Sequence, residues 1–120
     1  MATLQTGWHV RQGDVLIRRI EAIPDRARKV HVRRMVLAAG EATGHAHVLE
    51  RPGADGATAE LLRLGDRLLA RILGGDARVI HEEHAAVVLP PGEYEIVRQR
   101  EYVPPPAGMP HRATTRTVRD

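Results

Sequence analysis

The chain has 120 residues, of which 42% are hydrophobic and 28% charged, and it contains no cysteine. This length fits one domain with one core, and the lack of cysteine excludes disulfides and thiolate zinc sites. No apolar run is long enough to cross a membrane, and the first ten residues do not resemble a secretion signal. We therefore expect a cytoplasmic protein with no membrane contact.

The basic residues are almost all arginine, with Lys29 as the single lysine, and the formal net charge is +3. Guanidinium groups keep their charge at any working pH, which makes nucleic acid one partner class to consider. The arginines are scattered, 15 acids lie among them, and Trp8, Tyr94 and Tyr102 are the only aromatic residues that could stack on bases. We therefore rank nucleic-acid binding below the alternatives.

Alternation and turn signals predict strands along most of the chain. Residues 15–20 follow a Gln-Gly-Asp turn and are rich in β-branched residues, which predicts the first strand. Residues 30–37 form the second predicted strand, residues 41–45 a loop, and residues 47–50 the third strand. Residues 51–56, with one proline and two glycines, predict a loop of high flexibility.

The segment 59–73 has two interpretations. Four of its apolar residues recur at helical spacing, which would give an amphipathic helix. Gly65-Asp66, however, fits a two-residue turn with glycine first and is flanked by two runs of similar length. We favour the hairpin and keep the helix as the alternative.

The last predicted strands lie at residues 77–81, 84–89 and 93–102, with the final two pairing across Pro90-Pro91-Gly92. The proline run at 104–106 cannot continue a ladder, and little beyond it can be buried. The sequence therefore predicts an all-β fold, a small antiparallel sandwich or barrel over residues 8–103. A flexible, proline-rich C-terminal arm follows over residues 104–120.

Two close pairs of histidines are the main candidates for chemistry. His45 and His47 lie two residues apart, so a strand would place both imidazoles on one face. His81 and His84 flank two glutamates that could ligate a metal or orient the rings. If the two hairpins pack together, these four histidines predict a nitrogen-rich site for zinc, iron, manganese or nickel. The alternative is that the rings only hydrogen-bond backbone groups in turns.

The sequence from Gly40 to His47, followed later by Pro90-Pro91-Gly92, resembles the cupin pattern of glycine, His-x-His and a downstream Pro-x-Gly. That resemblance implies a metalloenzyme in which His45, His47 and a third histidine hold the ion. No histidine follows the Pro-Pro-Gly here, so the third ligand would be His81 or His84.

The chain also resembles a group of small uncharacterised proteins of bacteria and their phages. The resemblance is carried by an ordered set of segments over residues 12–102: QGDV at 12–15, TGHAH at 43–47, HEEH at 81–84, LPPG at 89–92 and QREY at 99–102. This group implies no activity and assigns no catalytic residue.

The sequence contains no complete catalytic motif. Serine and cysteine are both absent, and no glycine-rich phosphate loop is present. We therefore expect a non-enzymatic binding or assembly protein with a paired-histidine site for a divalent metal, forming a homo-oligomer or binding a protein partner. A cupin-like metalloenzyme is the alternative, and an RNA-associated accessory protein is a third and weaker one.

Overall fold

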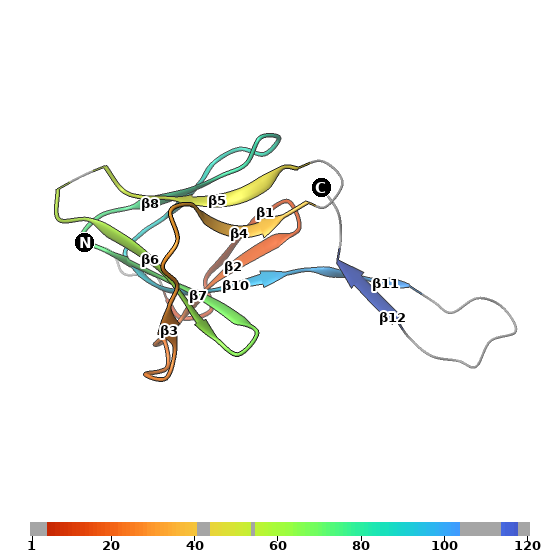
Figure 1. Ribbon diagram of the computed structural model, residues 1–120, viewed down its shortest axis with the longest axis horizontal. Helices are drawn as coiled ribbons and strands as arrows, with labels where there is room; N and C mark the ends of the chain where they lie inside the picture. Colours follow the sequence, from red (N-terminus) through yellow and green to blue (C-terminus); the bar gives the residue numbers. More distant parts are fainter. Residues whose placement is uncertain (1–4, 41–43, 54, 104–113, 118–120) are drawn as a thin grey trace, which may run out of the picture.

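The computed structural model describes residues 5–40, 44–53, 55–103 and 114–117, and Figure 1 shows most of its strands arranged around a common interior, with one two-stranded ladder set apart. The described residues form strands and connections without helix, and every strand pairing is antiparallel. The predicted all-β class and its antiparallel sheets are confirmed. No helix in the described part of the chain is long and apolar enough to span a membrane.

Six strands form the larger sheet, in the order β1-β2-β10-β7-β6-β3. Their bounds are β1 His9–Gln12, β2 Val15–Ile20, β3 Arg28–Lys29, β6 Thr58–Leu64, β7 Arg67–Leu73 and β10 Gly92–Arg98. The smaller sheet has the order β4-β5-β8-β9. It consists of β4 Met35–Ala39, β5 Ala46–Glu50, β8 Ala77–Ile80 and β9 Val87–Leu89, with a register shift in β4 between Val36 and Ala38.

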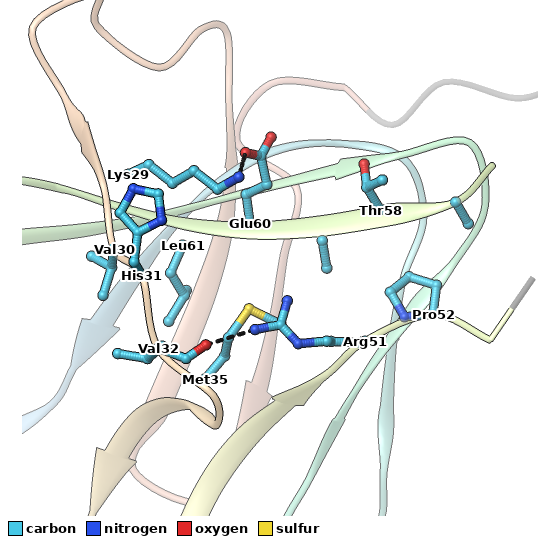
Figure 2. A pocket seen from close by; sticks show the side chains of 12 residues that line it. Lys29, Val30, His31, Val32, Met35, Arg51, Pro52, Thr58, Glu60 and Leu61 are labelled. Carbon is cyan, nitrogen blue, oxygen red and sulfur yellow. Dashed lines mark hydrogen bonds and ion pairs between the residues drawn. The ribbon is translucent and has the colours of Figure 1, made fainter. Parts of the chain in front are cut away.

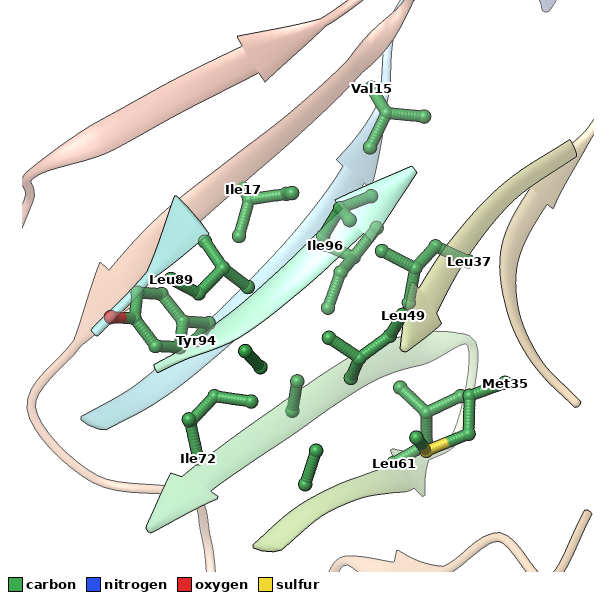
Figure 3. Packing of buried hydrophobic residues seen from close by; sticks show 14 residues of the cluster. Val15, Ile17, Met35, Leu37, Leu49, Leu61, Ile72, Leu89, Tyr94 and Ile96 are labelled. Carbon is green, nitrogen blue, oxygen red and sulfur yellow. The ribbon is translucent and has the colours of Figure 1, made fainter. Parts of the chain in front are cut away.

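The inward faces of the two sheets enclose the core (Figure 3). Ile17, Ile96 and Leu68 lie in register across three strands of the larger sheet, and Met35, Leu49 and Val79 do so in the smaller one. Side chains two residues apart on a strand share a face, which explains how alternating sequences bury these rows together. The core is closed at one side by Tyr94, which is fully buried and donates its hydroxyl to Pro90 O at 2.5 Å.

The predicted hairpin over residues 59–73 is confirmed, and the helix alternative is wrong. Strands β6 and β7 pair from Thr58↔Leu73 to Leu64↔Arg67. Gly65 has φ +60°, a conformation that glycine adopts without steric cost at the first turn position. Of the four apolar residues at helical spacing, Leu61, Leu68 and Ile72 face the main core, whereas Leu64 lies on the other face of the sheet.

Two sequence predictions were wrong, one about the extent of a strand and one about strand pairing. Residues 30–37 do not form one strand, because the chain leaves the larger sheet after β3 and enters the smaller sheet at Met35. β9 and β10 do not pair with each other either: β9 pairs with β8, whereas β10 pairs with β2 and β7. Pro90-Pro91 therefore joins the two sheets instead of turning a hairpin.

The outward face of the larger sheet explains where many arginines go. Ile23 from the β2–β3 connection covers Leu62 and Leu69 in a second small core. Beside it, Glu95 pairs with two arginines, Arg18 at 2.6 Å and Arg67 at 2.9 Å. Arg71 pairs similarly with Glu93 at 2.9 Å, and Lys29 with Glu60 at 2.9 Å. These cations are neutralised within the sheet.

The chain beyond β10 forms a separate two-stranded ladder of β11 (Arg100–Val103) and β12 (Thr114–Thr117). The strand predicted over 93–102 is therefore divided at Gln99. The flexible arm predicted for residues 104–120 lies outside the described residues, except for β12.

Candidate metal centre

Three segments that are distant in sequence meet at one end of the sandwich. They are the β1–β2 turn at residues 12–15, the start of β5, and the β8–β9 connection at residues 81–84. The ring centroids of His47 and His81 lie 4.3 Å apart, those of His81 and His84 4.6 Å, and those of His45 and His81 5.7 Å. The structure thus gathers all four predicted histidines into one cluster.

The structure brings His45 and His47 together in a different way from the prediction, which placed both rings on one face of a strand. His45 precedes β5, which begins at Ala46, so only His47 lies in the strand. His47 points into the sandwich on the same face as Leu49, whereas His45 reaches the cluster from the connection. The two rings therefore occupy different environments, one buried and one half-buried.

His47 is fully buried, and both of its ring nitrogens contact polar side chains. Nδ1 lies 2.8 Å from Gln12 Oε1, and Nε2 lies 3.2 Å from Asp14 Oδ1. The Gln12 amide donates to the carbonyls of Val79 at 3.0 Å and Ala85 at 2.9 Å, which identifies its nitrogen and leaves Oε1 as an acceptor. His47 Nδ1 must therefore donate to Gln12.

Asp14 holds the other side of His47. Its second carboxylate oxygen accepts from Arg98 Nε at 2.8 Å, and the aspartate side chain is almost completely buried. An arginine at this distance favours the ionised carboxylate, so the proton on the contact with His47 lies on the imidazole. With both nitrogens donating, His47 presents no lone pair to a metal ion in this arrangement.

The turn between Gln12 and Asp14 is shaped to admit the histidines. Gly13 has φ +57°, and a Cβ there would lie 2.7 Å from Nε2 of His84 and 3.2 Å from Cε1 of His47. Glycine is therefore required twice, for the left-handed backbone and for the close approach of the rings. The stacked rings of His47 and His84 lie 6.0 Å apart.

Among the described residues, His45, His81 and Glu82 form a group whose ligand atoms lie close enough together to hold a metal ion. One nitrogen of each histidine and one carboxylate oxygen of Glu82 all lie within 4.8 Å of one another. His81 is buried, His45 is half-buried, and Glu82 is exposed, so the group opens to solvent on the side of the carboxylate. The set of two imidazoles and one carboxylate suits divalent transition metals.

Backbone hydrogen bonds preorganise Glu82. Its own N–H and that of Ala46 hold the pKa of the Glu82 carboxyl below its usual range, with His45 and His81 adding to the effect. Both oxygens lie 3.2 Å from Ala46 N. The carboxylate is thus charged and tied to the start of β5, next to His45.

The second glutamate of the HEEH segment positions the imidazoles. Glu83 N donates to His81 Nδ1 at 3.0 Å, so this nitrogen carries a lone pair, and ligation through it would replace the hydrogen bond from Glu83 N. The Glu83 carboxylate lies 3.3 Å from His45 Nδ1. Glu50, which the sequence places near His47, instead pairs with Arg78 at 3.7 Å.

Sequence reasoning identified the histidines but missed Gln12, Asp14 and Arg98 as their partners, because the first two were interpreted only as a turn. The sequence does contain one signal: Gln12 and Asp14 are polar residues that lie next to the apolar residues of a predicted strand. Their burial, to 2% and 5% exposure, becomes evident only when the β1–β2 turn is packed against β5.

The comparisons with known proteins identify a family but assign no activity. A family model described as a domain of unknown function, DUF8820, matches residues 11–99. The chain therefore belongs to this family, and the matched region begins at β1 and includes every residue of the histidine cluster. No curated protein and no solved structure is similar enough to the chain to count as a match.

Proposed function

We propose that this member of the DUF8820 family is a non-enzymatic binding protein that holds a divalent transition metal through His45, His81 and Glu82. The observation that carries the proposal is the meeting of two imidazole nitrogens and one carboxylate oxygen within 4.8 Å. Zinc, iron, manganese and nickel all accept such a donor set.

The distances allow ligation after a small adjustment. Zinc lies about 2.0–2.1 Å from histidine nitrogen, so two ligands of one ion are at most about 4 Å apart. In tetrahedral geometry the separation is about 3.3 Å, so donor atoms that lie within 4.8 Å of one another must close by up to about 1.5 Å. Glu82 is exposed and lies at a bend, so its side chain can supply this movement without disturbing the core.

The buried residues beside the three ligands give the site a rigid wall. His47 contacts His81 across 4.3 Å and is itself fixed by Gln12 and Asp14. Such outer residues orient metal ligands and commonly affect affinity strongly. We therefore assign His47 to positioning, and ligation by His84 stays a prediction.

The test is metal binding by the untagged full chain, measured by titration calorimetry and by elemental analysis after dialysis against zinc, manganese, iron(II) or nickel. We expect one ion per chain. Glu82→Gln keeps an oxygen for the Ala46 N–H but removes the charge, and we expect at least tenfold weaker binding. His45→Ala should lower the affinity by at least as much.

Two matched variants separate this site from general charge and histidine effects. Glu21→Gln removes an exposed carboxylate outside the histidine cluster, and His31→Ala removes a histidine that lines a different part of the molecule. Both should leave the affinity within about threefold, because neither residue is in the ligand group. Wild-type protein that takes up no metal, or equal losses in Glu82→Gln and Glu21→Gln, would refute the proposal.

Self-association is the second part of the proposal, and the outward face of the smaller sheet supports it. Val36 and Ile80 lie in register on either side of the buried Val48 on this face, with Val36 36% exposed, and Val88 on the edge strand β9 is 50% exposed. An apolar row beside a sheet edge favours pairing with a second copy. We expect a dimer by light scattering, and Val36→Lys should shift it to a monomer; a wild-type monomer at high concentration would contradict this.

The two alternative functions have less support. A cupin-like enzyme needs an apolar pocket beside the metal, and two cavities of the described part of the chain have linings that include none of the four histidines. RNA binding needs unpaired cations on one face, whereas three arginines of the larger sheet, Arg18, Arg67 and Arg71, pair with Glu93 or Glu95.

A further inference from the structure

A separate cavity of about 710 Å³ lies between the sheets, on the side of strands β3 and β6 (Figure 2). It forms where the ladder between β3 and β6 ends. Val30 N donates to Leu61 O at 2.8 Å, and the next residues turn away from β6 to reach β4. The edge of β6 near Ala59 therefore borders a groove instead of a neighbouring strand.

The floor of this groove is apolar and continuous with the core. Met35, Ala59 and Leu61 are buried core residues that also line the cavity, and Val30 packs against the same cluster. Val32 lies at the mouth with 40% of its surface exposed. A ligand that entered here would remove Val32 and the floor from water, which favours an apolar body.

The rim of the groove is basic. Lys29, His31 and Arg51 line it against a single acid, Glu60, which pairs with Lys29 at 2.9 Å. Arg51 is exposed, and its Nη2 donates to Val32 O at 2.7 Å, which directs the guanidinium across the opening (Figure 2). One hydrogen bond leaves other N–H donors of this fork for a ligand.

We propose that the groove binds a small amphipathic carboxylate, whose apolar chain covers Met35 and Leu61 and whose carboxylate pairs with Arg51. Arginine binds carboxylates through parallel hydrogen bonds, and a pocket of this volume is in the range that holds small molecules. The site is independent of the metal centre, since no residue is common to both.

The experiment compares decanoate with decanol, which has the same chain length but no charge, by calorimetry and by NMR shift changes in the full protein. We expect decanoate to bind about tenfold more tightly than decanol. Arg51→Gln should remove this difference, because glutamine can still donate to Val32 O but has no charge. Val32→Glu places a carboxylate at the mouth and should weaken decanoate at least tenfold while leaving the core intact.

Arg11→Gln is the matched control, because Arg11 is exposed on β1, at the edge of the larger sheet opposite to β3. It should bind decanoate as the wild type does. Equal affinity for decanoate and decanol, no binding of either, or an unchanged affinity in Arg51→Gln would overturn the proposal. A wild-type dimer that Val32→Glu converts to a monomer would also overturn the proposal, because a second copy of the chain would then occupy the groove. Stripping the metal with a chelator should leave decanoate binding unchanged, so failure here is distinguishable from failure of the metal proposal.

Discussion

Gln12 is the residue whose substitution tests the buried polar network most directly. Its side chain makes three hydrogen bonds, to Val79 O, Ala85 O and His47 Nδ1, and the residue is 2% exposed. Gln12→Met keeps the length and removes all three. At about 1 kcal/mol for each buried hydrogen bond, we expect a loss of about 3 kcal/mol in the free energy of unfolding.

Gln12→Glu sharpens the test, because a carboxylate still accepts from His47 but cannot donate to the two carbonyls. We expect it to destabilise at neutral pH by at least as much as Gln12→Met, since buried oxygens then face one another. Urea denaturation followed by the fluorescence of Trp8 measures both variants. The control is Gln5→Met, an exposed glutamine. A loss below about 1 kcal/mol in both Gln12 variants would refute the hydrogen-bond assignment.

Three further predictions concern single positions. Gly13→Ala should destabilise by about 1–2 kcal/mol from its left-handed backbone and should shift the ring resonances of His84; an unchanged His84 spectrum would contradict the close approach. Burial raises the pKa of Tyr94 to about 12, so the unfolded chain ionises first and stability should fall between pH 10 and about pH 12. In Tyr94→Phe the midpoint of urea denaturation should decrease less over this pH range. A decrease equal to that of the wild type would exclude ionisation of Tyr94 as its cause. Glu95→Gln should cost less than about 1 kcal/mol at low salt, and the difference should shrink in about 1 M sodium chloride; a difference that does not depend on salt would indicate packing instead of charge.

Local signals predicted most of the strands but not the sheets to which they belong. The turn at Gly65-Asp66 was decisive because a two-residue hairpin is determined by its own residues. Pro90-Pro91-Gly92 has equally strong turn chemistry, yet it carries the chain from the smaller sheet to the larger one. Turn residues report that the chain changes direction, whereas the choice of partner strand depends on which faces must be buried together.

The same distinction explains why the candidate site was predicted in part. Histidine pairs are visible in the sequence, and the structure brings all four together. What separates a ligand from a positioning residue is the contact made by each ring nitrogen. His47 lies between an amide oxygen and a carboxylate, whereas His81 accepts from a backbone N–H. Those contacts come from the β1–β2 turn and the β8–β9 connection, which the spacing of the histidines does not reveal.

The buried polar residues also suggest why the fold retains them. Replacing a buried ionic group by apolar residues is often neutral or stabilising, so the pair of Asp14 and Arg98 is not needed for stability alone. The pair fixes His47 against His81. A site whose donor atoms lie within 4.8 Å of one another gains affinity when its buried ligand, here His81, is already held in place. Binding then requires a small movement of the Glu82 carboxylate, which its hydrogen bonds to Ala46 N already hold near His45. On this argument Asp14→Asn should weaken metal binding more than its effect on stability explains, because the ring of His47 would lose its fixed orientation.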